Sequence, residues 1–220
     1  MFDHLNDIDT DVLLAVNGMH NAFQDALWWM VSAKWSSLLI IITLIWVLLH
    51  QNRRHALLAL AMLALALLVA DQISSGLIKQ LVERLRPTHD PVLGDAVHIV
   101  NGYRGGLYGF VSSHAANSFA AATFIALLFR NRAVTIGMTV WALLQCYSRI
   151  YLGVHYPGDI LGGLTVGLLS GWLVWLLMGW IERHWRIPRG FYTRNDATIL
   201  VCAIGITLLA ILAAATFQVL

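Results

Sequence analysis

Six long apolar runs constrain this chain more than any other feature of its sequence. They cover about residues 35–50, 55–78, 114–130, 133–150, 158–181 and 197–218. Most of them are close to the ~20 residues that an α-helix needs to cross a bilayer, and lipid tolerates only helices or closed barrels as spanning structures. We therefore predict an all-α integral membrane protein with six transmembrane helices, of which the first and fourth are short.

The composition supports a membrane protein and argues against nucleic-acid binding. Hydrophobic residues make up 59% of the chain and charged residues 12%, whereas soluble domains have roughly 45–50% and about 25%. The net charge of +2 is too small to attract nucleic acid, and no run of like charges forms a tail. We predict one membrane-embedded domain over residues 1–220, with the bilayer as its surroundings and no obligate protein partner.

The segment before the first apolar run has a different pattern. Between Val12 and Met30, apolar residues recur at three- and four-residue steps with polar residues between them, which predicts an amphipathic helix. Trp28 and Trp29 at its end are typical of a membrane interface. We expect residues 1–34 to form an N-terminal interfacial segment, and packing onto the protein's own loops is the alternative.

Six spans place alternate loops on opposite sides of the membrane and so sort the basic residues. One side receives Arg53, Arg54, Arg130, Arg132, Arg183, Arg186, Arg189 and Arg194. The other side receives Lys34, Lys79, Arg84, Arg86, Arg104 and Arg149. By the positive-inside rule the side with eight arginines is cytoplasmic. We therefore predict a multi-pass protein of a bacterial inner membrane, with its polar clusters facing the periplasm or the cell exterior.

Three reactive side chains lie between the fourth and fifth apolar runs. They are Arg149, His155 and Asp159, and charged groups so near hydrocarbon indicate a functional site. The planar fork of Arg149 suits phosphate oxygens. An aspartate bonded to one imidazole nitrogen of His155 leaves the other nitrogen free to attack. The alternative is a purely structural histidine–aspartate pair at the start of a helix.

Two cations follow the second apolar run. Lys79 and Arg86 are seven residues apart, so on a helix they project from one face about 10 Å apart along the axis. Two long cationic side chains can converge on one anion from there. The alternatives are cations that extend to the membrane interface, or cations neutralised by Glu83.

A serine pair and a histidine open the third apolar run. A serine directly before an apolar helix is an N-cap, and the free N–H groups at that helix end bind anions. Ser112 or Ser113 can cap the helix and donate to phosphate, with His114 beside the anion; a plain cap and an interfacial histidine are the alternative. The long loop 87–111 on the same side can shape or cover a site. Together the three clusters describe a phosphoryl-transfer site.

In chain order the clusters read Lys-x6-Arg-Pro, then Ser-x-His, then Ser-Arg-x5-His-x3-Asp. This pattern, from Lys79 to Asp159, resembles the three-part signature of the type 2 phosphatidic acid phosphatase family, which includes membrane lipid phosphatases. The middle motif departs from the family's usual Pro-Ser-Gly-His, since Val111 and Ser113 replace the proline and the glycine. The serine keeps the backbone donor but crowds the phosphate, and loss of proline loosens the turn into the helix.

The resemblance also implies a mechanism. His155 is the expected nucleophile, Asp159 orients it and His114 protonates the leaving oxygen. The residues expected to hold the phosphate are Lys79, Arg86, Ser112, Ser113 and Arg149. Because these cations supply the charge that Mg²⁺ supplies elsewhere, we expect neither a metal nor another cofactor.

The position at the membrane edge favours a substrate whose lipid tail stays in the bilayer. We predict a membrane lipid phosphatase acting on a lipid phosphate or diphosphate, with undecaprenyl diphosphate as the favoured substrate. Phosphatidylglycerol phosphate, phosphatidic acid and lipid A phosphate are the alternative substrates. Transfer of the phosphoryl group to another lipid and carriage of a lipid phosphate without hydrolysis are the alternative functions.

Overall fold

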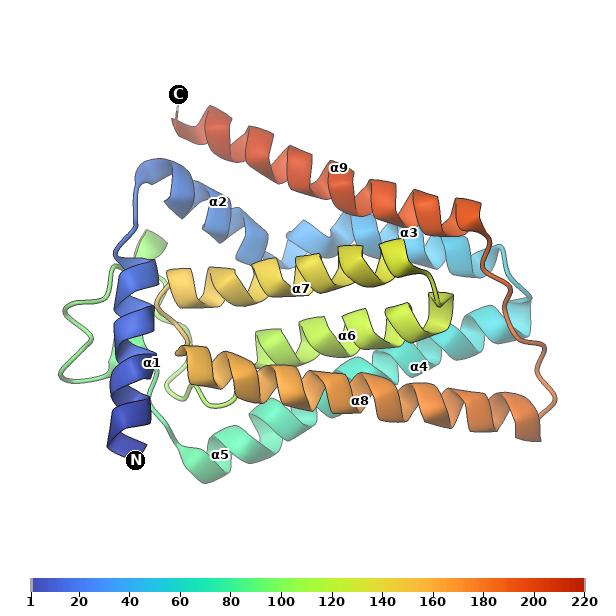
Figure 1. Cartoon of the computed structure of the whole chain (residues 1–220), viewed down its shortest axis with the longest axis horizontal. Helices are drawn as coiled ribbons and strands as arrows, with labels where there is room; N and C mark the ends of the chain where they lie inside the picture. The colour runs from blue at the N-terminus through green and yellow to red at the C-terminus, as the bar shows by residue number, and fades with distance from the viewer. Residues whose placement is uncertain (1, 220) are drawn as a thin grey trace.

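The computed structural model describes residues 2–219, which form a bundle of helices (Figure 1). In chain order the elements are α1 (Phe2–Asn17), α2 (Ala22–Ser32), η1 (Lys34–Ser37), α3 (Leu38–Leu49), α4 (Arg53–Asp71), η2 (Gln72–Ile78), α5 (Lys79–Val82), η3 (Pro87–His89), η4 (Val100–Gly102), α6 (Ser113–Phe129), α7 (Arg132–Tyr151), α8 (Pro157–His184) and α9 (Arg194–Val219). The elements η1, η3 and η4 are 3₁₀ turns, and η2 is a π-helical segment that joins α4 to α5. The described residues contain no strand, which confirms the all-α class.

The helices α6 and α7 lie at the centre of the bundle. Helix α6 packs against α4, α7 and α8, while α7 also packs against α9 and α2. These long helices run roughly side by side, and α1 lies across one end of them (Figure 1). The end that carries α1 also holds α5, the start of α6, the end of α7 and the start of α8.

The predicted number of six spans is not confirmed. Three helical stretches are long and apolar enough to cross a bilayer, namely Arg53–Val82, Pro157–His184 and Arg194–Val219. Helices α2 and α3 pass the same test only as a pair, and they are bent by 63° at Ala33 between them. Helix α6 is apolar but has only 17 residues. Helix α7 is interrupted by polar side chains such as Thr139 and Gln145.

The prediction of one amphipathic helix from Val12 to Met30 is wrong. The chain forms α1 and α2 instead, because the first ends near Gly18 and Asn21 caps the second by accepting a 2.9 Å hydrogen bond from the Gln24 N–H. Helix α2 packs on α9 and α7, and Trp28 contacts the ring of Tyr147 with the centroids 4.4 Å apart. This is the predicted alternative of packing onto the protein itself, and a location at the membrane surface stays a prediction.

A row of glycines lets α8 lie very close to α6. A Cβ atom added to Gly163 would be 2.4 Å from the carbonyl oxygen of Ser112, and one added to Gly167 would be 2.4 Å from that of Ala116. At Gly171 the corresponding distance, to the Ala120 carbonyl, is 2.6 Å. Small residues at four-residue spacing permit such backbone contact between membrane helices. The start of α8 is thereby held against the start of α6.

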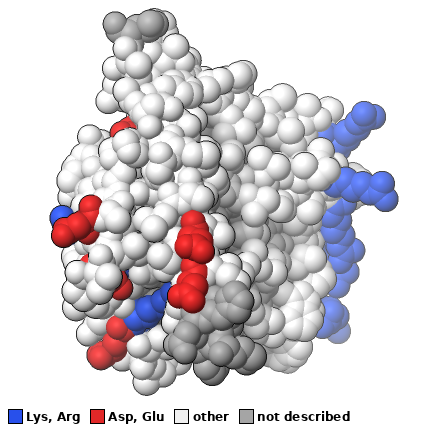
Figure 2. All heavy atoms as spheres, turned by 60° about the vertical axis from the view of Figure 1, so that its left-hand side comes forward, with Lys and Arg blue, Asp and Glu red and all other residues white. Residues whose placement is uncertain are grey.

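Charge separates between the two ends of the bundle. The eight arginines predicted to share one side lie at the ends of α4, α6, α7, α8 and α9 that are opposite to α1. Figure 2, turned to bring the α1 end forward, shows acidic side chains on that end and a row of basic ones at the far edge. The grouping of the arginines is therefore confirmed, while the assignment of their end to the cytoplasm stays a prediction.

The glycine row gives a test of the α6–α8 packing. We expect Gly167→Ala to lower the free energy of unfolding by about 1–3 kcal/mol, because its methyl group meets backbone that cannot move aside. The matched control is Gly205→Ala in α9, where an added Cβ meets nothing within 4 Å. Thermal unfolding of both variants in detergent makes the comparison, and equal stability of the two would contradict the packing described here.

Candidate active site

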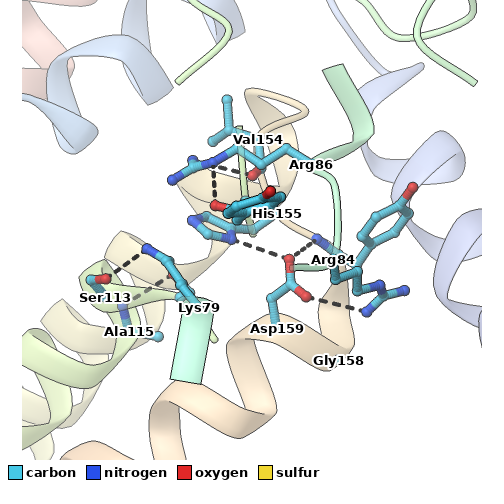
Figure 3. Close-up of polar contacts among 12 residues, drawn as sticks. Lys79, Arg84, Arg86, Ser113, Ala115, Val154, His155, Gly158 and Asp159 are labelled. Carbon is cyan, nitrogen blue, oxygen red and sulfur yellow. Dashed lines mark hydrogen bonds and ion pairs between the residues drawn. The ribbon is translucent and has the colours of Figure 1, made fainter. Parts of the chain in front are cut away.

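The α1 end of the bundle gathers the residues predicted to form the site. Lys79 begins α5, Ser113 and His114 begin α6, Arg149 lies in the last turn of α7, and Asp159 lies in the first turn of α8. The remaining three, Arg86, Ser112 and His155, lie in the connections before α6 and α8. Figure 3 shows how several of these side chains face one another.

The imidazole of His155 and the carboxylate of Asp159 form a buried pair. Nδ1 of His155 is 3.2 Å from Oδ2 of Asp159, and the side chains are 1% and 0% exposed (Figure 3). The same carboxylate oxygen accepts a 3.1 Å hydrogen bond from the N–H of Tyr156, which caps α8 just before Pro157. Burial, with the positive charges of Arg86 and Arg149, holds the pKa of His155 well below 6.5. The ring is therefore neutral at pH 7.

The other oxygen of Asp159 contacts Arg84, a residue that the sequence analysis used only to assign the sides of the membrane. Nη1 of Arg84 lies 3.2 Å from Oδ1 of Asp159, and its Nη2 lies 2.9 Å from Oδ2 of Asp9 in α1. Oδ1 of Asp9 in turn accepts a 2.7 Å hydrogen bond from the N–H of Gly158. The guanidinium also lies 4.1 Å from the centre of the Tyr156 ring. Helix α1 thus takes part in fixing the first turn of α8.

Lys79 is held toward the start of α6. Its Nζ donates a 2.8 Å hydrogen bond to Oγ of Ser113 (Figure 3). Oγ of Ser75 lies 2.6 Å from the same oxygen. Ser75 lies in the π-helical segment η2 and also donates to Asp71 over 3.5 Å. The serine that replaces the family's usual glycine therefore contacts the lysine directly, and Asp71 belongs to the same chain of polar contacts.

Lys79 and Arg86 do not share a helix face, so that prediction is wrong. Helix α5 ends at Val82, and Glu83 adopts a left-handed conformation with φ 50°, which turns the chain back toward the bundle. Nε of Arg86 then donates to the carbonyl of Tyr108 over 3.1 Å, and its Nη1 donates to that of Val154 over 3.3 Å. Within residues 2–219, Glu83 pairs with neither cation. The predicted neutralisation by Glu83 is therefore absent there.

The loop 87–111 folds over these groups. The backbone N–H of Arg86 donates to the carbonyl of Leu107 over 3.0 Å, and that of Gly109 donates to the Arg84 carbonyl over 2.8 Å. A Cβ atom on Gly109 would be 2.8 Å from Oδ2 of Asp159, and one on Gly105, whose φ is +69°, would be 2.7 Å from Nη1 of Arg86. Glycine is therefore needed at both positions for the loop to lie this close to the site.

Arg149 reaches the site without a hydrogen bond to any other predicted site residue. Its Nη1 donates to Oγ of Ser32 at the end of α2, and its Nη2 donates to the Tyr103 hydroxyl over 3.0 Å. Burial raises the pKa of Tyr103, but the charge and hydrogen bond of Arg149 outweigh it and lower the pKa. Nε of Arg149 is buried and has no partner among the described residues. This N–H group is thus free to donate to an anion.

The start of α6 is arranged as the sequence predicts. Ser112 is the N-cap, and its Oγ accepts a 3.4 Å hydrogen bond from the N–H of Ala115. The N–H of Ser112 donates to the carbonyl of Asp159 over 2.9 Å, which ties the starts of α6 and α8 together. Val111, in place of the family's usual proline, packs at Gly162, where an added Cβ would be 2.4 Å from Cγ1 of the valine.

A cavity of about 210 Å³ opens beside His114. Most of the residues that line it have polar side chains, among them Ser32, Lys34, Ser36, Asn117, Ser118 and Gln145. Oδ1 of Asn117 is buried and has no hydrogen-bond partner among the described residues. The hydroxyl and amide side chains of the lining suit a ligand group that carries hydroxyls or amides.

The arrangement is suited to binding a tetrahedral oxyanion beside a neutral imidazole. Three cations, the free N–H groups of a helix start and a buried histidine–carboxylate pair lie at one end of the bundle. Within residues 2–219, no group of three or more His, Cys, Asp or Glu side chains is positioned to hold a metal ion. The residues missed by sequence reasoning are Asp9, Ser32, Arg84 and Tyr103, which hold the predicted ones in place.

Comparison with known proteins identifies related sequences and folds. The PAP2 superfamily matches residues 55–183. A lipid A 4′-phosphatase of Bacteroides thetaiotaomicron is 40% identical over 179 residues, which cover 80% of this chain and 80% of that protein. An undecaprenyl-diphosphatase of Bacillus subtilis is 42% identical over 64 residues, 29% of this chain and 32% of that one. The crystal structure of a PAP2-type phosphatidylglycerolphosphate phosphatase from Bacillus subtilis superposes with a TM-score of 0.60 and 25% identity, covering 84% of this chain and 90% of that one.

The unpartnered Nε of Arg149 gives a test of anion binding. We expect Arg149→Lys to weaken binding of vanadate about tenfold or more, because an ammonium group cannot contact Ser32 and Tyr103 and also supply the free Nε–H of the planar guanidinium. Arg132→Lys, an exposed position at the other end of the same helix, is the control. Isothermal titration of the purified protein with vanadate measures the affinities. An unchanged affinity for Arg149→Lys would show that this guanidinium does not contact the anion.

Proposed function

The chain belongs to the PAP2 superfamily, and from this premise we propose that it hydrolyses a membrane lipid phosphate through a phosphohistidine on His155. The observation that carries the proposal is the buried His155–Asp159 pair. Asp159 accepts from Nδ1 and so leaves the lone pair on Nε2, where it can attack phosphorus. The lowered pKa of His155 keeps this lone pair available at neutral pH.

In the proposed reaction, the cations bind the phosphate and stabilise the charge that develops in the transition state. Arg149, with its free Nε, approaches from the last turn of α7. Arg86, beside the Val154 carbonyl, approaches from the connection after α5, and Lys79 approaches from α5 itself. The hydroxyls and N–H groups of Ser112 and Ser113 add donors at the start of α6. Preorganised donors of this kind supply a large part of the rate enhancement in acyl and phosphoryl transfer.

His114 is the proposed general acid. It lies one residue into α6 and lines the 210 Å³ cavity, so a leaving group occupying that cavity has its oxygen beside the imidazole. After the leaving group departs, water attacks the phosphohistidine and His114 takes the proton from it. Ser32 and Lys34 bound the same cavity from the bend between α2 and α3.

A phosphorylated glycolipid of the lipid A type is the proposed substrate. Two observations support it: the relative at 40% identity is a lipid A 4′-phosphatase, and the cavity beside His114 is lined by hydroxyl and amide groups that suit a sugar. Undecaprenyl diphosphate, the substrate favoured by the sequence, is the second candidate. It is supported by the 42% identity over 64 residues to an undecaprenyl-diphosphatase.

We also propose how the protein sits in its membrane. With the eight-arginine end in the cytoplasm, the site faces the periplasm or cell exterior. We propose further that residues 1–220 act as one domain. Support for a single unit comes from α1 and α2, whose Asp9 and Ser32 contact the side chains of Arg84 and Arg149.

The covalent intermediate gives the first test. We expect His155→Ala to abolish turnover and to eliminate the phosphoenzyme trapped from ³²P-labelled substrate by an alkaline quench, in which a phosphohistidine survives. His184→Gln, an exposed histidine at the opposite end of the bundle, is the control and should retain both. Labelled protein recovered from His155→Ala would remove His155 from the nucleophile's role.

Substrate class is tested by a phosphate-release panel in detergent with a chelator present throughout. The panel contains lipid A, undecaprenyl diphosphate, phosphatidylglycerol phosphate and phosphatidic acid. We expect lipid A to have the highest kcat/KM, and Asn117→Leu to lower that value about tenfold by removing a buried amide from the cavity. The same variant should have little effect on the hydrolysis of undecaprenyl diphosphate. The leaving group of that substrate is a charged lipid phosphate, which has no sugar to contact the Asn117 amide. A faster reaction with undecaprenyl diphosphate would instead favour the second candidate.

A further inference from the structure

A second and larger cavity lies at the opposite end of the bundle from the candidate active site. It has a volume of about 460 Å³ and is enclosed by the ends of α6 and α8 and by the connection from α8 to α9. Along α8, Asp159 and Glu182 are separated by roughly 35 Å at a rise of about 1.5 Å per residue. This cavity therefore cannot share a ligand's phosphate with the active site.

The lining of the cavity includes a polar cluster around two buried side chains, His55 and Glu182. Nδ1 of His55, which is 2% exposed, lies 2.9 Å from Oε1 of Glu182, and its Nε2 lies 2.8 Å from the hydroxyl of Tyr192. Nε of Arg189 is 3.4 Å from the other oxygen of Glu182. A Cβ atom on Gly190 would be 2.4 Å from Nε2 of His55, so the connection lies tightly against this ring. These contacts hold the α8–α9 connection in place as one wall of the cavity.

The rim of the cavity carries an excess of positive charge. Arg130, Arg183 and Arg189 line it, whereas Glu182 is its one carboxylate and is already engaged by His55 and Arg189. Arg130 and Arg183 are exposed and form no ion pair within residues 2–219. The guanidinium of Arg130 instead lies 5.7 Å from the centre of the Trp175 ring. Two guanidinium groups at the rim are thus without an acidic partner among the described residues.

The walls of the same cavity are apolar and lie in α6 and α8, of which α8 is long and apolar enough to cross a bilayer. Leu127, Leu128 and Phe129 of α6 face Trp175, Leu176 and Met178 of α8. Two exposed tryptophans lie at the same end of α8, with Trp180 53% and Trp185 68% exposed. Tryptophans gather where a helix leaves the hydrocarbon for the headgroup layer. The cavity therefore opens at the depth where a phospholipid changes from acyl chain to phosphate.

From this combination we infer a binding site for an anionic phospholipid, with its phosphate on Arg130 and Arg183 and an acyl chain along α6 and α8. Basic pockets between membrane helices bind anionic headgroups in this way. The site is separate from the candidate active site and does not depend on the proposed hydrolysis. A lipid held there links the end of α6, the end of α8 and the connection fixed by His55, and so stabilises the arginine-rich end of the bundle.

The test compares two double variants that remove the same charge from the same end. The full chain in detergent is titrated with phosphatidylglycerol, phosphatidylcholine and inorganic phosphate, and binding is followed by native mass spectrometry. We expect Arg130→Gln with Arg183→Gln to weaken phosphatidylglycerol binding about tenfold, since it removes two charge-assisted contacts. The control double variant, Arg53→Gln with Arg54→Gln, lies at the start of α4 and outside the cavity lining. It should change the affinity for phosphatidylglycerol less than about twofold, because it weakens only the long-range electrostatic attraction of the lipid to this end of the bundle.

Three outcomes would overturn the inference. If both double variants weakened phosphatidylglycerol binding equally, the lipid would be attracted to the arginine-rich end as a whole and not to this cavity. Phosphatidylcholine binding as tightly as phosphatidylglycerol would indicate an apolar groove without headgroup recognition, and displacement of the lipid by inorganic phosphate would indicate a free-phosphate site. The single variant Arg183→Gln guards against misfolding, because this exposed side chain forms no hydrogen bond within the described residues. It should weaken phosphatidylglycerol binding about threefold while its unfolding temperature without lipid stays unchanged.

Discussion

The carboxylate of Asp159 is the group on which the architecture of the α1 end depends. A fully buried negative charge is stable only if partners surround it. Here His155, the N–H of Tyr156 and Arg84 share its two oxygens, and Asp9 shares Arg84. Removing one partner would leave the others incompletely compensated in a place that water does not reach. The elements that supply them are therefore bound to one another through a single side chain.

The backbone of the same residue joins α8 to α6 at this end. The carbonyl of Asp159 accepts from the N–H of Ser112, and this contact needs the starts of α6 and α8 in near backbone contact. Gly163 and Gly167 permit it, because a side chain at either position would meet a carbonyl of α6. Packing in the apolar part of the bundle and hydrogen bonding in its polar part thus support the same geometry.

The sequence predicted the ranges of the long helices better than the bends and turns between helices. The runs at 114–130, 158–181 and 197–218 correspond to Ser113–Phe129, Pro157–His184 and Arg194–Val219, because continuous apolar residues determine where a helix lies. The run at 35–50 did not reveal the bend at Ala33, which depends on how α2 packs on α7 and α9. Helical periodicity also failed beyond Val82, since nothing in the sequence marks Glu83 as left-handed.

For the site, the spacing of the motifs singled out the groups that we propose to face the phosphate, but not the residues that hold them in place. Asp9 and Arg84 are 75 residues apart, and Ser32 and Arg149 are 117 apart. No local pattern links such pairs, and Arg84 looked like one more charge in a loop. Helix α1 contributes to the site through a single aspartate, which an amphipathic pattern does not single out. Contacts of this kind follow from the tertiary structure alone.

Helix α8 has a buried carboxylate at each end, and each is joined to a histidine and an arginine. Asp159 fastens its first turn to α1 and the loop before α6, while Glu182 fastens its last turn to α4 and to the connection that follows. Helix α8 can therefore neither slide along its axis nor turn about it without breaking the contacts of these two buried carboxylates. We expect any movement that admits a lipid to occur in the helices that face α8 and not in α8 itself.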